Sequence, residues 1–143
     1  MKLITMFILC ISLCKNCSSQ SQNDLKKAEV EYTANTRGYY LKISIKDQMV
    51  SISNDRNATG SLVGTKISDA DWEELIESFK TIDLKGISAL KSPTEKRFYD
   101  GAAIANLKII TNGKEYSTMS FDNGFPPVEI EKLVTKITLL AKE

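Results

Sequence analysis

Residues 102–121, AAIANLKIITNGKEYSTMSF, decide the fold because they have the pattern of a β-hairpin. Two apolar-rich runs, residues 102–111 and 114–121, flank the pair Asn112-Gly113. Asn-Gly readily adopts the positive φ values of a two-residue type I′ turn, which joins antiparallel strands. The sequence therefore predicts an antiparallel sheet at the centre of the fold.

Further strands are expected upstream of this hairpin. In residues 39–46 (YYLKISIK) apolar and polar side chains alternate, which is typical of a half-buried antiparallel strand. Asp47-Gln48 would turn the chain into a short returning strand at residues 49–52, and residues 54–60 (NDRNATG) have the composition of a loop. Weaker strand patterns occur at Val30 with Tyr32, and at Leu62 with Val63.

Two amphipathic helices are expected to cover the sheet. Ser68 can cap a helix whose apolar positions are Trp72, Leu75, Ile76 and Phe79. Pro126-Pro127 suits the start of a second helix, whose stripe is Ile130, Leu133, Val134, Ile137 and Leu140. The expected fold is α+β: an antiparallel sheet of about four to six strands with both helices on one face, in the order strands, helix, hairpin, helix. Residues 28–143 form this single domain, with an irregular connector over residues 82–93.

The N-terminus has the pattern of an export signal. Lys2 precedes an eleven-residue apolar run, residues 3–13 (LITMFILCISL), which is too short to span a bilayer. Residues 1–13 are therefore expected to be a signal peptide, and the polar stretch that begins at Cys14 resembles the lipid-attachment site of bacterial lipoproteins. Cys17 is the alternative site, and residues 14–27 would form a flexible tether. Secretion as a soluble periplasmic protein, cleaved after Ser19, is the alternative to lipid anchoring.

The body resembles a family of small envelope lipoproteins from the Bacteroidetes group that carry a domain of unknown function. The likeness covers residues 37–140 and rests on five segments: Arg37-Gly38-Tyr39-Tyr40; Ile67-Ser68-Asp69 with Trp72, Leu75 and Phe79; Ile82-Asp83-Leu84; Asn112-Gly113-Lys114; and Pro126-Pro127. The resemblance implies an α+β fold and an envelope location, and it implies no particular activity.

Composition argues against several classes of function. The chain has no histidine, and its three cysteines all lie within the first 17 residues, so the body lacks the histidine and cysteine ligands typical of zinc, copper and iron sites and has no thiol nucleophile. Lys plus Arg total 19 against 18 Asp plus Glu, which gives no basic field for nucleic acid. The acidic group Asp69, Asp71, Glu73 and Glu74 is interpreted as a favourable helix N-terminus rather than a metal site. No catalytic residue, cofactor or metal is therefore expected.

Four residues in loops or at strand ends form the candidate binding surface: Arg37, Arg97, Tyr99 and Asp100. An arginine near an aromatic ring can bind a carboxylate or a sugar hydroxyl, whereas Arg97 and Asp100 could instead form a surface ion pair. The expected function is a non-enzymatic binding module of the cell envelope, whose partners are the membrane, through the lipid, and an envelope protein or glycan. The alternative is a small periplasmic hydrolase or carbohydrate-active enzyme that uses two carboxylates.

Overall fold

The computed structural model describes residues 26–58 and 62–142, so the predicted signal peptide over residues 1–13, Cys14 and Cys17 lie outside the described residues. Along the chain the elements are β1 (Glu29–Asn35), β2 (Tyr40–Lys46), β3 (Met49–Ser53), β4 (Gly64–Lys66), α2 (Asp69–Lys80), the short 3₁₀ helices η1 (Ile87–Ala89) and η2 (Lys96–Tyr99), β5 (Ile104–Thr111), β6 (Lys114–Ser117), β7 (Phe121–Asp122) and α3 (Glu131–Leu140).

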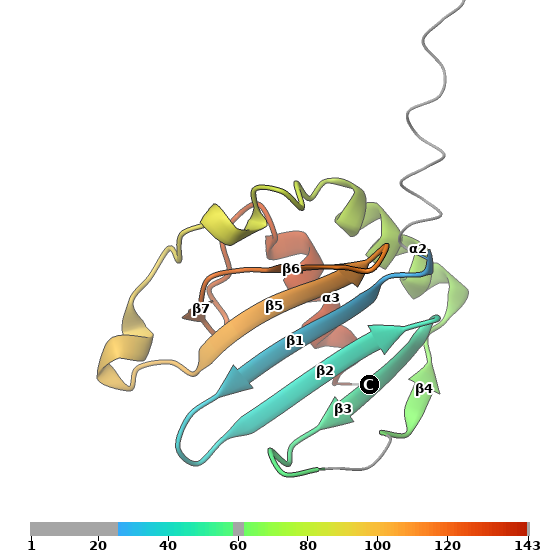
Figure 1. Cartoon of the computed structure of the whole chain (residues 1–143). Coiled ribbons are helices and arrows are strands. Elements are labelled where there is room, and N and C mark those ends of the chain that lie inside the picture. The colour runs from blue at the N-terminus through green and yellow to red at the C-terminus, as the bar shows by residue number, and fades with distance from the viewer. Residues whose placement is uncertain (1–25, 59–61, 143) are drawn as a thin grey trace, which may run out of the picture.

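The strands form one antiparallel sheet (Figure 1). Its order is β4-β3-β2-β1-β5-β6, with β7 also paired to β5, so the N-terminal strand β1 lies in the middle. The expected α+β fold with an antiparallel sheet is confirmed. The sheet has seven strands, more than the four to six expected, because the edge beside β5 is divided between β6 and β7.

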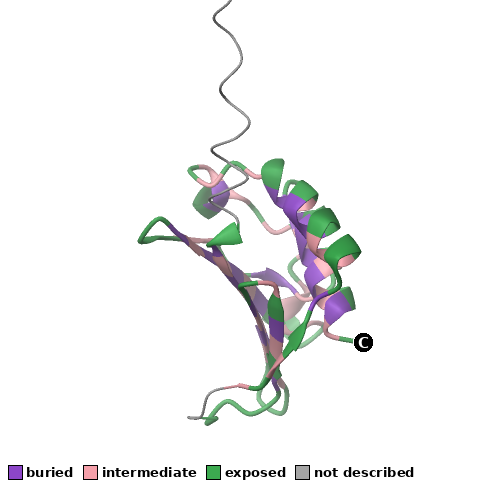
Figure 2. Cartoon of the chain, turned by 90° about the vertical axis from the view of Figure 1, so that its right-hand side faces the viewer, coloured by how far each residue is buried: buried purple, intermediate pink, exposed green. Residues whose placement is uncertain are grey.

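The hydrophobic core lies between the sheet and the two longer helices, which Figure 2 shows on the same side of the sheet. Alternate residues of β1 enter this core: Val30, Tyr32 and Ala34 are buried, whereas their neighbours are partly exposed. The helices contribute Leu75, Ile76 and Phe79 from α2 and Leu133, Val134, Ile137 and Leu140 from α3. Side-chain alternation therefore leaves the polar residues of the strands on the opposite face.

The two short turns form as the sequence predicts. Asn112 and Gly113 have φ values of 50° and 71°, which confirms the type I′ hairpin between β5 and β6. Asp47 and Gln48, between β2 and β3, also have positive φ values, 50° and 61°.

The first helix is confirmed and the start of the second is corrected. The Ser68 hydroxyl accepts a hydrogen bond from the Asp71 backbone N–H and caps α2, as expected. The second helix was expected to start at Pro126-Pro127, but α3 begins only at Glu131. Pro127 is instead the first residue of a turn in which the Ile130 N–H donates to its carbonyl, and the helix starts after that turn.

Two strand predictions were also wrong in detail. The strand expected at Leu62 and Val63 forms instead over β4, and Val63 is 93% exposed. The strand expected over residues 114–121 is interrupted: Ser117 opposes Lys108 and Phe121 opposes Ala105, so this edge contains one more residue than β5 between the two pairs. Such an extra residue is a β-bulge. Its Thr118 hydroxyl accepts the Leu107 N–H at 3.0 Å, which keeps that backbone donor bonded within the bulge.

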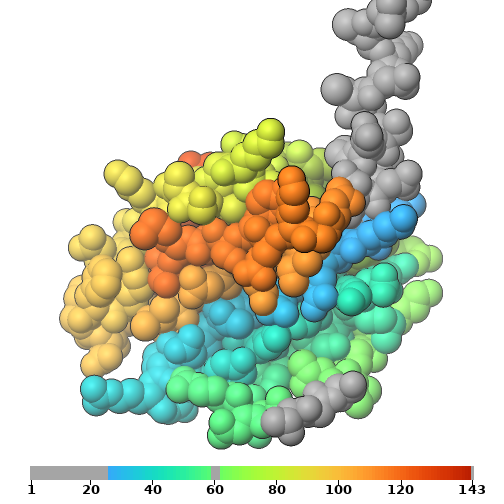
Figure 3. Space-filling model, in the orientation of Figure 1, coloured from blue at the N-terminus to red at the C-terminus, as the bar shows by residue number. Residues whose placement is uncertain are grey.

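The two ends of the sheet differ, and they are named here by their position along β1. The proximal end is where β1 begins, beside the turns Asp47-Gln48 and Asn112-Gly113, because Val30 opposes Ile45 and Glu29 opposes Ile110. The distal end is where β1 finishes, with residues 36–39, 54–58, 92–103 and 123–130 around it. Figure 3 shows the segment around η2, in yellow to light orange, forming part of the surface at this end.

Candidate binding surface at the distal end

Asp122 fixes the loop that carries η2. Its side chain is fully buried and accepts hydrogen bonds from the Thr94 hydroxyl, from the Lys96 N–H at 2.6 Å and from the Arg97 N–H at 3.0 Å. The guanidinium of Arg97 adds an ion pair, with Nη1 3.0 Å from Oδ1. One carboxylate therefore connects β7 to both the backbone and a side chain of a segment about 25 residues away.

The same contacts determine the protonation of Asp122. Burial raises the pKa of a carboxyl group, but the hydrogen bonds from Thr94, Arg97 and Lys96 outweigh it and hold the pKa of Asp122 at about 2. The side chain is therefore ionised at neutral pH. A buried charge that is hydrogen-bonded on both oxygens restrains the loop, because any movement would leave it without partners.

This restraint holds two aromatic side chains in solvent. Phe98 and Tyr99, the last two residues of η2, are each 72% exposed. Asp100 then takes a left-handed conformation, with φ 59°, and the Gly101 N–H returns to the Lys96 carbonyl at 2.8 Å. Large aromatic side chains normally gain about 1.5–3 kcal/mol from burial, so a fixed loop that exposes two in succession indicates an interaction surface.

Neighbouring contacts extend the ordered surface. The Lys96 ammonium lies 3.8 Å from the ring centroid of Phe125, which is 40% exposed, and the Arg97 guanidinium lies 4.3 Å from that of Phe98. Tyr32 of β1 is bonded to the loop after β7, because its hydroxyl donates to Asn123 Oδ1 at 2.6 Å. Burial raises the pKa of Tyr32, so this donor stays protonated.

The four residues of the predicted binding surface all lie at this end, although they do not form one cluster. Arg37 is exposed in the β1–β2 turn, and Tyr99 and Asp100 are exposed on the η2 loop. Arg97 turns inward, with its side chain 12% exposed, and its ion-pair partner is Asp122 rather than Asp100. The alternative that Arg97 pairs with Asp100 was therefore wrong, whereas ligand binding by the four residues stays a prediction.

Sequence reasoning missed Asp122, Phe98 and Arg56. Asp122-Asn123-Gly124 has the composition of a turn, and nothing local indicates that the aspartate is buried beneath a distant loop. Phe98 was available as a signal, since Phe98-Tyr99 is an aromatic pair without the periodicity of a strand or helix. Arg56 lies in a loop recognised from its turn residues alone, and its contacts with the β1–β2 turn depend on tertiary structure.

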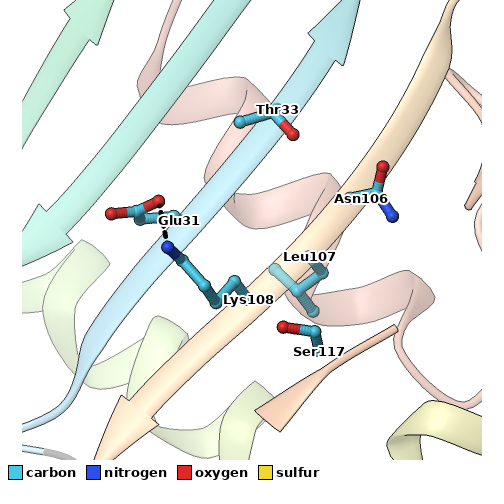
Figure 4. A pocket seen from close by; sticks show the side chains of 6 residues that line it. All are labelled: Glu31, Thr33, Asn106, Leu107, Lys108 and Ser117. Carbon is cyan, nitrogen blue, oxygen red and sulfur yellow. Dashed lines mark ion pairs between the residues drawn. The ribbon is translucent and has the colours of Figure 1, made fainter. Parts of the chain in front are cut away.

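A shallow hollow of about 300 Å³ lies on the uncovered sheet face (Figure 4). It is lined by Glu31, Thr33, Asn106, Leu107, Lys108 and Ser117. Glu31 lies 3.0 Å from the Lys108 ammonium and 3.3 Å from that of Lys42. Burial raises the pKa of Glu31, but these two lysines outweigh it and the net shift is downward. Among its described lining residues the hollow holds a single carboxylate, already neutralised, which gives no support to the two-carboxylate enzyme.

Two acidic residues of α2, Asp71 and Glu74, connect this helix to α3. Lys136 of α3 places its ammonium 2.6 Å from both Asp71 and Glu74, which joins the two helices. The hydrogen bond from Lys136 is the main cause of the lowered pKa of Asp71. Over residues 26–58 and 62–142, no three cysteine, histidine or acidic side chains are grouped as they would be around a metal ion.

The comparisons with known proteins assign no family. No protein-family model matches the sequence, and no curated protein matches it significantly. Within the described part of the chain, no helix has the length and apolar character needed to span a membrane.

Proposed function

We propose that this chain is a non-enzymatic binding module of a bacterial cell envelope, which binds another envelope protein through its distal end. In this proposal residues 1–13 are a signal peptide, and a lipid on Cys14, or alternatively on Cys17, attaches the protein to a membrane facing the periplasm or the exterior. Residues 14–27 are the tether and residues 28–143 the binding domain. The order strands, helix, hairpin, helix, with both helices on one face, leaves the distal loops free for a partner.

The observation that carries the proposal is the fixed exposure of Phe98 and Tyr99. Both side chains are 72% exposed on a loop whose backbone is bonded to buried Asp122. A preorganised aromatic anchor loses little conformational entropy on binding. Aromatic and arginine side chains also dominate the energetic centres of protein interfaces, which favours a protein partner over a glycan.

The position of the distal end also supports the proposal. The described chain begins at the proximal end, and β1 then runs the length of the sheet to the distal end. Seven strand residues at about 3.3 Å each separate the two ends by roughly 20 Å. A tether attached before β1 would therefore leave Phe98 and Tyr99 at the opposite end of the sheet from the attachment point.

Position-specific crosslinking tests the proposal. A photoreactive phenylalanine analogue replaces Tyr99 in the full chain, and in a matched control it replaces Leu139, which is 50% exposed on α3. We expect a discrete crosslinked protein from position 99 in native membranes and none from position 139. Phe98→Ala with Tyr99→Ala should weaken binding to that protein about 30-fold or more, as for an interface hot spot, whereas Leu139→Ala should leave it unchanged.

Three results would contradict the proposal. Equal crosslinking from both positions, or unchanged affinity after the double substitution in a protein with an unchanged melting temperature, would remove the distal end as the binding surface. A product that resists protease but yields to glycan-degrading enzymes would make the partner a glycan.

The attachment is tested by detergent phase partition: the unmodified chain should enter the detergent phase and the Cys14→Ala, Cys17→Ala form the aqueous phase. Aqueous partition of both forms at equal mass would show that no lipid is attached.

A further inference from the structure

All three arginines of the chain, Arg37, Arg56 and Arg97, lie at the distal end. The ion pairs on the uncovered sheet face and between the helices use lysine instead, at Lys42, Lys46, Lys108 and Lys136. Arginine differs from lysine in its planar fork of donors, which matches the oxygens of carboxylates and phosphates. The side chains that can bind an oxyanion through a planar fork of donors therefore all lie at the distal end.

The oxyanion that Arg97 binds is the internal carboxylate of Asp122. Arg56 is held differently: its Nη2 donates to the Thr36 carbonyl at 3.0 Å, and its guanidinium lies 5.8 Å from the ring centroid of Tyr40. These contacts place Arg56 against the β1–β2 turn, where Arg37 directly follows Thr36. Arg37 and Arg56 therefore lie on neighbouring loops at the same corner of the molecule.

Neither arginine is neutralised by its neighbours. Asp55, next to Arg56, accepts the Asn57 N–H at 2.8 Å and so serves its own loop. Within residues 26–58 and 62–142, no carboxylate forms an ion pair with Arg37 or Arg56, in contrast to Arg97. The corner thus carries two arginines without an ion-pair partner among the described residues, and one of them, Arg56, is held in place by its contacts.

We propose that Arg37 and Arg56 form a recognition site for a phosphate monoester. The inference rests on the proposed function in taking the distal end as the binding end, and it adds the chemistry of a ligand there. A phosphate monoester carries about −1.5 to −2 charge at pH 7 and three free oxygens, which match two guanidinium forks. A carboxylate offers one charge and two oxygens, and would leave one arginine without its counter-charge.

Calorimetric titration of the full chain in a neutral detergent tests the site. The probes are inorganic phosphate, glucose 1-phosphate and the short-chain lipid dihexanoyl phosphatidic acid, with methyl glucoside and acetate as controls. We expect saturable binding of the phosphate probes that weakens with salt, and no comparable binding of the controls. A preference for glucose 1-phosphate would identify a phosphorylated glycan as the source, and a preference for the phosphatidic acid would identify a lipid headgroup.

Substitutions assign the binding to the two arginines. Arg37→Ala with Arg56→Ala should reduce phosphate affinity at least 10-fold, and Arg56→Lys, which keeps the charge without the fork, should also reduce it. Lys114→Ala removes one exposed charge at the proximal end and should have no effect. Equal affinity in the unmodified chain and the double-arginine variant, or no saturable binding of any phosphate probe, would overturn the inference.

The same measurements separate this inference from the proposed function. Phe98→Ala with Tyr99→Ala should weaken binding to the protein captured from position 99 while leaving phosphate affinity unchanged, because the aromatic pair contributes no charge. If the crosslink is absent but phosphate binding still depends on both arginines, the site stands and the protein partner is wrong. If the crosslink is present but no phosphate probe binds, the protein partner stands and the phosphate site is wrong.

Discussion

The proximal and distal ends of the sheet are built in different ways. At the proximal end the strands are joined by two two-residue turns, Asp47-Gln48 and Asn112-Gly113, all four residues having positive φ values. At the distal end longer segments meet, and a buried ion pair between Arg97 and Asp122 holds one of them in place. The proximal turns are fixed by local backbone preference, whereas the distal loops depend on contacts between distant parts of the chain.

This difference separates structural residues from candidate binding residues. A two-residue turn is too short to present a side-chain surface, and the proximal turns contain no aromatic residue. The distal loops carry Phe98, Tyr99 and all three arginines. Binding residues concentrate in loops that a rigid scaffold positions, and here Asp122 of β7 holds the loop that carries η2.

The largest expected effect comes from breaking that connection. Asp122→Ala removes the acceptor for the Lys96 and Arg97 N–H groups and leaves the Arg97 guanidinium, 12% exposed, without its counter-charge. Loss of one partner of a buried pair typically costs about 3–5 kcal/mol, so we expect a decrease of that order in the free energy of unfolding, measured in urea. Hydrogen exchange should show the Lys96 and Arg97 amides losing protection before those of β1.

Lys46→Ala is the matched control, because it removes a cation from the exposed pair with Glu29, where the lysine side chain is 61% exposed. Exposed pairs contribute about 0–1 kcal/mol. Similar losses in the two variants would mean that the ion pair of Asp122 contributes no more to stability than an exposed surface pair, and the contrast between the ends would disappear.

A smaller effect is expected from acid, with a definite direction. The carboxyl of Asp122 has a pKa of about 2 in the fold against 3.8 when unperturbed, so it stabilises the fold above pH 3.8 and loses this contribution as the pH falls towards 2. The difference between these two pKa values corresponds to about 2 kcal/mol in the free energy of unfolding. Urea unfolding at several pH values should show that the difference in the free energy of unfolding between the unmodified chain and Asp122→Asn becomes smaller by about this amount on acidification. A difference in the free energy of unfolding that does not change with pH would show that the fold does not stabilise the ionised form of Asp122 over the protonated form.

The proximal end could be predicted from sequence, and so could much of the sheet. Asn112-Gly113, the alternation in β2 and the Ser68 cap act through neighbouring residues, which is why each was found at its expected place. The bulge between β6 and β7 and the late start of α3 at Glu131 were not, because tertiary pairing decides both. Pro126-Pro127 permits a helix start without requiring one.

The distal end could be predicted only in part. Arg37, Tyr99 and Asp100 were expected to be exposed because they lie in loops, and they are. The inward turn of Arg97 was missed because its partner, Asp122, is 25 residues away and has the local appearance of a turn residue. Arg56 was missed because its contact with Thr36 forms only when the loop after β3 folds against the β1–β2 turn.

The smallest expected effect concerns glycine and compares the two ends directly. Gly113 has a φ of 71° and open space where a Cβ would be added, so Gly113→Ala is strained by its backbone conformation alone. We expect a loss of about 1 kcal/mol in urea unfolding, since a left-handed conformation costs an L-residue roughly 1–2 kcal/mol. Gly38 at the distal end also has open space but no positive φ, so Gly38→Ala should be neutral or slightly stabilising through the unfolded chain. Equal losses in the two variants would mean that the turn conformation of Gly113 does not limit stability, and that the proximal end is not set by local backbone preference. Because Gly113 lies at the other end of β5 from η2, its substitution should also leave binding at the distal end unchanged, and a loss of binding there would show that the two ends are coupled.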